Sequence, residues 1–152
     1  MNLRIYADTS VFGGCFDDEF EIYSKRLMGE FKKGLKILAI SDLTLRELEN
    51  APKFVQEVLK SIPEQYREYL LLDEESKLLG QKYIEEGVIG SKYLLDAQHI
   101  ALATVNRVDV LVSWNFQHIV NLKRIHLYNS TNLKYGYPII EIRSPREVLD
   151  EV

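Results

Sequence analysis

The segment LRIYADTSVF, residues 3–12, runs from an apolar stretch into a carboxylate and two hydroxyls. Ile5, Tyr6 and Ala7 are typical of a buried strand, and Asp8 follows them directly. A carboxylate at the end of a buried strand is costly in free energy unless another group pairs with it. We therefore expect distant parts of the chain to bring partners to Asp8.

The other apolar runs of the chain alternate with segments of helical periodicity and are apolar on both faces. That pattern is typical of a parallel sheet covered by helices. The sequence therefore predicts an α/β fold, a three-layer α/β/α sandwich around a mainly parallel sheet. The expected strands are 3–7, 35–41, 108–113 and 137–144, and the expected helices are 17–33, 43–50, 52–60, 74–86 and 92–107.

Capping residues mark the ends of these helices. Ser41, Asp73 and Ser91 are predicted N-caps, because their side chains can accept from the free amides of a first helical turn. Ser144–Glu147 has the pattern of a capping box, which predicts a further helix near the C-terminus. Gly34 is expected to end the helix 17–33.

The composition fits one globular domain over residues 1–152, with 46% hydrophobic residues. The single cysteine, Cys15, excludes an intramolecular disulfide and is typical of the reducing cytoplasm, where we expect the protein. No apolar stretch is long enough to cross a bilayer, so no membrane association is expected. With a net charge of −4, nucleic-acid binding requires a local basic surface or a metal.

Several polar residues are predicted to meet at one edge of the sheet. In parallel α/β sheets, ligands bind beyond the carboxyl ends of the strands. Each of the candidates named below is also compatible with a cap or an exposed position. On the helix 43–50, Glu49 is an alternative to Glu47. Asp96 is predicted to lie on an apolar face of the helix 92–107, and a carboxylate there is rarely left unpaired. The candidates are Asp8, Glu47, Asp96, Ser113 and Asn115.

Four motifs, IYADTSVF, ISDLTLRELEN, YLLDAQHIALAT and DVLVSWNFQHI, together resemble a PIN-domain nuclease. They cover nearly the whole chain, in the order and at the spacing of that family. The resemblance implies a PIN-like sandwich whose acids hold Mg²⁺ or Mn²⁺. The implied metal ligands are Asp8, Glu47 and Asp96. The implied catalytic residues are these three and Asn115, which stands at the place of a fourth acid. The hydroxyls that support the site would come from Ser113 and from either Thr9 or Ser10.

The activity implied by the resemblance is hydrolysis of RNA by a metal-activated water. Hard divalent cations take oxygen ligands, and Mg²⁺ keeps several waters beside one or two carboxylates. The ion makes water a better nucleophile and offsets charge on the phosphate. The choice of RNA over DNA follows from the family alone.

The resemblance also implies partners. Small PIN proteins are often the toxin of a toxin–antitoxin pair and are often dimers, so an antitoxin protein and a homodimer are expected. The helices 17–33 and 52–61 carry apolar stripes that favour such an interface.

The chain departs from the family pattern because no Asp or Glu occurs between Val110 and Ile140. The carbonyl oxygen of Asn115 can coordinate a metal but adds no charge. We therefore expect a site of three carboxylates that binds a second metal more weakly than the first. His118 is interpreted as a partly exposed histidine or, alternatively, as a phosphate contact.

Other aromatic and basic residues near these motifs have two interpretations each. We expect His99 to be packed and bonded to backbone, and Trp114 to close over the strand end as core rather than to stack on a base. Lys123 and Arg124 begin an acid-free segment that either contacts phosphates or covers the sheet edge.

Two other protein classes compete with this interpretation. A phosphotransferase of the haloacid-dehalogenase type also begins with a strand-end Asp, but it needs a second Asp where Ser10 stands. The remaining alternative is a PIN-like module that binds RNA or a protein partner and cleaves poorly. The missing fourth acid is its support in the sequence.

Overall fold

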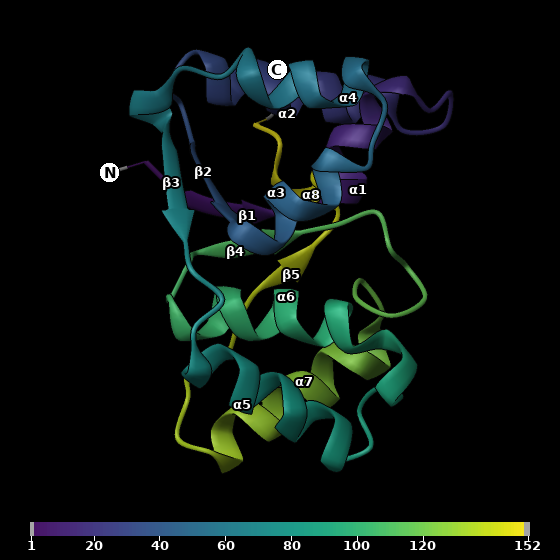
Figure 1. Ribbon diagram of the computed structural model, residues 1–152, viewed down its shortest axis with the longest axis vertical. Coiled ribbons are helices and arrows are strands. Elements are labelled where there is room, and N and C mark those ends of the chain that lie inside the picture. Colours follow the sequence, from purple (N-terminus) through teal and green to yellow (C-terminus); the bar gives the residue numbers. More distant parts are fainter. Residues whose placement is uncertain (1, 151–152) are drawn as a thin grey trace.

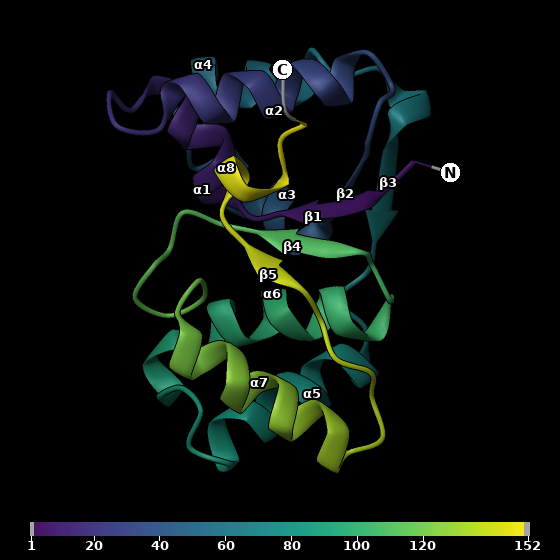
Figure 2. The ribbon, with the colours of Figure 1, turned by 180° about the vertical axis from the view of Figure 1, so that it is seen from behind.

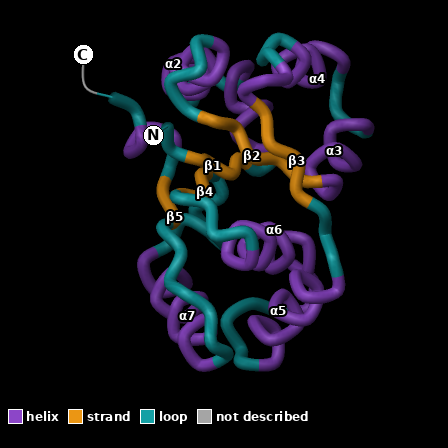
Figure 3. Tube along the Cα trace, turned by 90° about the vertical axis from the view of Figure 1, so that its left-hand side faces the viewer, coloured by secondary structure: helices purple, strands orange, loops and turns teal. Residues whose placement is uncertain are grey.

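The computed structural model describes residues 2–150 and contains a five-stranded sheet in the order β3-β2-β1-β4-β5. Every neighbouring pair of strands is parallel, as the sequence predicts. Figure 3 shows the sheet between two layers of helices. The strands are β1 (Arg4–Ala7), β2 (Ile37–Ser41), β3 (Arg67–Leu70), β4 (Val110–Val112) and β5 (Ile142–Arg143).

Helices cover both faces of the sheet, which confirms the three-layer α/β/α architecture (Figures 1 and 2). One face carries α2 (Glu21–Lys32) and α4 (Lys53–Lys60), and the other carries α5 (Glu74–Glu85), α6 (Leu94–Val105) and α7 (Leu122–Lys134). The remaining α-helices within residues 2–150 follow strands directly or after one residue: α1 (Thr9–Gly13), α3 (Asp42–Glu49) and α8 (Pro145–Val148). Within residues 2–150, no helix has the length and apolarity needed to cross a membrane.

The alternation of side chains along β1 divides the core into two clusters. Ile5 and Ala7 pack with Phe31 of α2, whereas Tyr6 points to the opposite face and packs with Ile100 of α6. All five side chains are fully buried. Because each large apolar side chain contributes about 1.5–3 kcal/mol on burial, these two clusters hold the three layers together.

Two elements were not predicted from the sequence. The segment 67–70, REYL, is an edge strand with a mostly polar sequence, so it lacks the apolar run that marks the central strands. The segment that begins at Lys123 belongs to α7, whose N-cap is Asn121. Asn121 Oδ1 accepts from the amide of Arg124 at 3.2 Å, and the capping pattern that would have indicated this helix was overlooked.

Three predicted boundaries were wrong. Ser91 does not cap a helix, because Ser91–Tyr93 forms a separate helical turn and α6 begins at Leu94. The helix expected from residue 17 begins at Glu21, after a turn in which Asp17 Oδ1 accepts from the amide of Glu19 at 2.9 Å. The expected strand 137–144 shortens to β5.

The other predicted helix ends are confirmed. Ser41 accepts from the amide of Thr44, and Asp73 accepts from the amide of Ser76. The capping box at Ser144–Glu147 has both of its hydrogen bonds. Gly34 follows α2 with a φ of +73°, a conformation that glycine adopts without a Cβ penalty.

Replacing Gly34 by alanine tests how this helix end packs. A Cβ there would lie 2.5 Å from Cζ of Tyr66, in addition to the strain of the positive φ. We expect Gly34→Ala to lower the free energy of unfolding by about 2–4 kcal/mol, measured by urea denaturation. Gly87→Ala is the control, because Gly87 has a φ of +75° with nothing within 4 Å, and it should cost only about 1–2 kcal/mol. Equal losses would contradict the contact with Tyr66.

Candidate active site

The site begins where β1 and β4 end side by side. Ala7 pairs with Val112 in the parallel ladder, and the amide of Asp8 donates to the carbonyl of Val112 at 3.3 Å. Asp8 and Ser113 therefore leave the sheet at the same level. Ser113 Oγ donates to Asp8 Oδ2 at 2.6 Å, so a residue 105 positions away supplies the partner that the buried carboxylate requires.

Asp8 is nearly completely buried, with 6% of its surface exposed. Its Oδ1 accepts from the hydroxyl of Ser10 at 2.5 Å and from the amide of Ser10 at 3.1 Å, which makes Asp8 the N-cap of α1. Ser10 Oγ also accepts from the amide of Trp114 at 2.9 Å and so ties the loop after β4 to α1. The contacts of Ser10 with Asp8 thus cap α1 and, at the same time, hold the carboxylate in place.

Burial raises the pKa of Asp8 above its ordinary value. The positive charge of His99 and the hydrogen bonds from Ser10 and Ser113 oppose this shift, and the negative charge of Glu47 adds to it. Burial also raises the pKa of Asp96, where His99 again opposes and the charges of Asp8 and Glu47 reinforce the shift. The charge of Glu47 therefore makes both Asp8 and Asp96 harder to ionise.

Glu47 of α3 is the carboxylate of this cluster that is held in its ionised form. Its Oε1 accepts from His99 Nε2 at 2.7 Å and from Thr9 Oγ1 at 3.0 Å. Burial opposes ionisation, but the hydrogen bond and charge of His99 and the hydrogen bond of Thr9 outweigh it, so the pKa of Glu47 lies below its ordinary value. Glu49, the competing acid on the same helix, is exposed.

His99 is packed, as expected, but the prediction that it bonds to backbone was wrong. It is 2% exposed, and its Nδ1 lies 2.6 Å from the hydroxyl of Tyr6. That hydroxyl lies 2.8 Å from Ser41 Oγ, so the imidazole is fixed on both sides. Sequence reasoning missed His99 as the residue that orients Glu47, because the two are 52 positions apart and no local pattern joins them.

Asn115 lies beside Asp96, as predicted, but presents the other end of its amide. Its Nδ2 donates to Asp96 Oδ2 at 3.4 Å, while its Oδ1 accepts from the amide of His118 at 2.9 Å. The amide nitrogen therefore faces Asp96, because the turn after β4 uses the carbonyl oxygen through which Asn115 could coordinate a metal. Asn115 contributes a hydrogen-bond donor to Asp96 and closes its own loop.

His118 is buried, so the interpretation of a partly exposed histidine was wrong. The side chain is 8% exposed, and its ring lies against that of Tyr93, with 3.9 Å between the centroids. Within residues 2–150, His118 Nδ1 has no hydrogen-bond partner. The amide of His118 donates to Asn115 Oδ1 at 2.9 Å, so His118 belongs to the same loop as Asn115.

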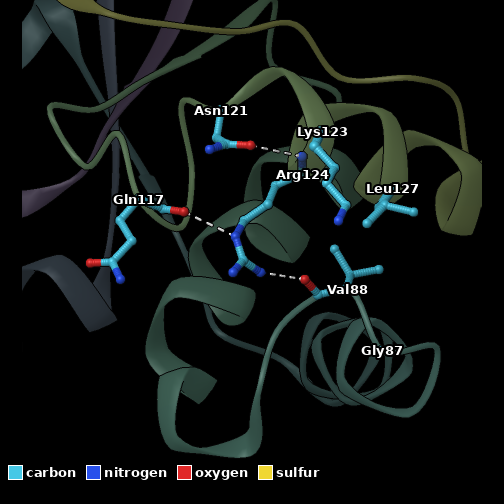
Figure 4. Close-up of a pocket in the computed structure, with 7 residues that line it drawn as sticks. All are labelled: Gly87, Val88, Gln117, Asn121, Lys123, Arg124 and Leu127. Atoms are coloured by element: carbon cyan, nitrogen blue, oxygen red, sulfur yellow. Dashed lines mark hydrogen bonds between the residues drawn. The ribbon is translucent and has the colours of Figure 1, made fainter.

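Arg124 and Lys123 line a hollow of about 410 Å³ between the end of α5 and the start of α7 (Figure 4). The guanidinium of Arg124 donates to the carbonyls of Gln117 and Val88, at 2.9 Å and 2.5 Å. Arg124 therefore joins two loops, whereas Lys123 makes no ion pair within residues 2–150. Trp114 is buried, as expected, and stacks on Phe20 with 4.1 Å between the ring centroids.

The donor atoms of the cluster are the hard oxygens that Mg²⁺ and Mn²⁺ prefer. Among residues 2–150, no three His, Cys, Asp or Glu side chains come together closely enough to enclose an ion. Asp8 and Asp96 supply two carboxylates, and Mg²⁺ characteristically combines one or two with several waters. The residues present therefore fit a hydrated divalent ion and do not fit an all-protein cage.

Two solved structures share this fold. VapC20 of Mycobacterium tuberculosis, described as a toxin that cleaves the Sarcin-Ricin loop, superimposes with a TM-score of 0.56 over 75% of this chain and 92% of its own, at 12% identity. VapBC2 from Rickettsia felis, bound to a DNA fragment from its promoter, superimposes with a TM-score of 0.56 over 93% of this chain and 98% of its own, at 15% identity. The PIN-like fold that the motifs predict is thereby confirmed. No family model and no curated protein matches the sequence.

The raised pKa of Asp8 predicts a stabilising substitution. In the unfolded chain this acid loses its proton near its ordinary pKa of 3.8, whereas in the folded protein it does so only at a higher pH. The free energy of unfolding therefore decreases as the pH rises from 3.8 through the pKa of the folded protein. Asp8→Asn removes this charge and leaves an amide that Ser10 and Ser113 can still bond. We expect a higher melting temperature than wild type at pH 7 in EDTA, with a difference that shrinks toward pH 4. A lower melting temperature at pH 7 would show that the cap contacts matter more than the repulsion.

Asn115→Asp restores the fourth acid of the family pattern. One carboxylate oxygen can keep the hydrogen bond from His118, and the other then faces Asp96, so repulsion increases in the metal-free protein. We expect a lower melting temperature in EDTA and binding of Mn²⁺ that is tighter by about tenfold, roughly 1.4 kcal/mol, measured by titration calorimetry. Unchanged affinity and melting would mean that residue 115 does not face the metal.

Proposed function

We propose that this protein is a Mg²⁺- or Mn²⁺-dependent endoribonuclease that hydrolyses phosphodiester bonds in RNA. What supports it best is that Asp8 lies just beyond the ends of β1 and β4, where Ser10 and Ser113 bond its two oxygens, while His99 and Thr9 bond Glu47, and Glu47 and Asp8 both act on the pKa of Asp96. Acids such as Asp8 and Asp96, whose pKa is raised by burial and by a neighbouring carboxylate, are characteristic of sites that bind divalent cations or transfer protons.

In this proposal Asp8 and Asp96 hold the hydrated ion. Ser10 and Ser113 each donate to one oxygen of Asp8, so both oxygens keep a fixed direction. When bound, the ion supplies an activated water and offsets charge that develops on the phosphate. Glu47, kept ionised by His99 and Thr9, accepts a hydrogen bond from a water at the edge of the cluster and takes up its proton.

The choice of RNA and of a toxin role is supported by the fold shared with VapC20, which cleaves the Sarcin-Ricin loop, and with VapBC2. An antitoxin protein and a second copy of this chain are the proposed protein partners. The exposed side chains of Ile22 on α2 and Phe54 on α4 favour that face for such a contact.

The second candidate function is a PIN-like module that binds RNA or protein and cleaves poorly. Asn115 favours it, because an amide stands at the place of the fourth acid and turns its oxygen into the loop. The two candidates differ in whether the protein turns over RNA when a divalent ion is present.

Glu47→Gln separates the candidates, with Glu49→Gln as the matched control two residues along the same helix. Glutamine can still bond to His99 and Thr9 but cannot take up a proton at this site. We expect cleavage of a labelled RNA by wild type in Mn²⁺ and none in EDTA. Glu47→Gln should reduce the rate by roughly a hundredfold or more, and Glu49→Gln should leave it unchanged.

Equal activity of Glu47→Gln and wild type would contradict the proposed role of Glu47. Cleavage that survives EDTA would contradict the metal dependence. A wild-type protein that binds RNA in Mn²⁺ without cleaving it would favour the second candidate.

A further inference from the structure

A hydroxyl in the middle of the core contacts the imidazole that orients Glu47. Tyr6 of β1 is completely buried, and its hydroxyl oxygen lies 2.6 Å from His99 Nδ1 and 2.8 Å from Ser41 Oγ. A polar atom at the centre of a sheet is costly in free energy unless it is bonded. A phenylalanine would fill the same space without a polar atom, so packing alone does not account for this hydroxyl.

The hydrogen bonds of Glu47 determine which nitrogen of His99 carries a proton. The pKa of Glu47 lies below its ordinary value, so the side chain is ionised at neutral pH and can only accept hydrogen bonds. The contact of 2.7 Å between Glu47 Oε1 and His99 Nε2 therefore requires a proton on Nε2. The other nitrogen, Nδ1, faces Tyr6, whose hydroxyl can either donate or accept. The imidazole is thus held at both nitrogens, with its Nε2–H directed at Glu47.

The hydroxyl of Tyr6 is held in turn by the beginning of α3. Ser41 caps that helix by accepting from the amide of Thr44 at 3.2 Å, and the same Ser41 Oγ contacts the Tyr6 hydroxyl. Burial raises the pKa of Tyr6 well above its ordinary value, so the hydroxyl keeps its proton at neutral pH. Because Glu47 also lies on α3, the contacts form a closed loop from Ser41 through Tyr6 and His99 to Glu47.

Both donors that reach Glu47 bind the same oxygen. His99 Nε2 and Thr9 Oγ1 lie 2.7 Å and 3.0 Å from Oε1, and a carboxylate oxygen has about two lone-pair sites. Within residues 2–150, Glu47 Oε2 accepts no hydrogen bond, and the side chain of Glu47 is 29% exposed. The closed loop of contacts therefore leaves Oε2 as the oxygen that is available to a water.

We infer that Tyr6 is a positioning residue for RNA cleavage, which acts through His99 to present Glu47 Oε2 to the attacking water. The inference rests on the proposed function, in which Glu47 takes up the proton of that water. Because Tyr6 is completely buried, its hydroxyl does not touch RNA and acts only through the imidazole. Loss of a hydrogen bond behind the residues of a metal site typically lowers activity by about ten- to a hundredfold.

The first test compares Tyr6→Phe with Tyr83→Phe. Tyr83 of α5 is the matched control, because it is completely buried in the same apolar cluster and its hydroxyl donates to Asn132 Oδ1 at 2.5 Å. Each substitution removes one buried hydroxyl and keeps the ring, so both should lower the melting temperature. For a labelled RNA in Mn²⁺, Tyr6→Phe should lower kcat by about tenfold with KM within about twofold of wild type. Tyr83→Phe should have the kcat of wild type.

A double substitution shows whether Tyr6 acts through Glu47. In the Glu47→Gln background the proton acceptor is already absent, so Tyr6→Phe should lower kcat by less than about twofold, measured in single turnover. A hydroxyl that serves stability alone would change kcat by the same factor in both backgrounds.

A third readout follows the imidazole without cleavage. In ¹⁵N-labelled protein in EDTA, wild type should show a slowly exchanging Nε2–H resonance for His99, because that proton is buried and bonded to Glu47. The chain has three histidines, and the resonance of His99 is the one that is absent from His99→Gln. In Tyr6→Phe the imidazole is no longer held at Nδ1, so this resonance should be lost by exchange with water. It should persist in Tyr83→Phe.

The outcomes distinguish this inference from the proposed function. If wild type cleaves RNA and Tyr6→Phe has the kcat of Tyr83→Phe, the inference alone is overturned. A His99 resonance that persists in Tyr6→Phe, or an equal loss of kcat with and without Glu47→Gln, also overturns the inference alone. Wild type that cleaves no RNA in Mn²⁺ overturns both.

Discussion

The parallel pairing of β1 with β4 positions the buried carboxylate of Asp8, and the rest of the site is arranged around that group. A carboxylate with 6% exposure needs partners, and the pairing brings Ser113 to one of its oxygens while the first turn of α1 brings Ser10 to the other. The loop after β4 is then tied to Ser10 through the amide of Trp114. This one constraint places Asn115 beside Asp96.

The second constraint is the fixed histidine on the opposite side of the cluster. His99 reaches Glu47 with one nitrogen and Tyr6 with the other, so a strand, a helix and the helix before β4 are joined in one chain of contacts. Its hydrogen bond lowers the pKa of Glu47, while burial keeps the pKa of Asp8 and Asp96 high. The carboxylates therefore differ in their readiness to ionise. That difference is the basis for assigning ion binding to Asp8 and Asp96 and proton transfer to Glu47.

Sequence reasoning predicted the features that follow from local patterns. Apolar runs gave the central strands, and the strand-end position of Asp8 indicated where other polar groups would gather. It missed β3, because an edge strand has a polar sequence, and it missed the partners of His99, because long-range side-chain contacts leave no local pattern. The orientation of the Asn115 amide could not be predicted for a similar reason: its oxygen is used by a turn that the sequence alone did not reveal. The single domain over residues 1–152 and the homodimer stay predictions.

The central claim is that Asp8 and Asp96 together hold a hydrated divalent ion. The measurement that tests it most directly is the anomalous difference density of crystals grown with Mn²⁺. The account predicts one strong peak about 2 Å from a carboxylate oxygen of Asp8 and of Asp96, with waters completing its coordination and Glu47 still bonded to His99. A peak elsewhere on the molecule, or no peak at millimolar Mn²⁺, would contradict it.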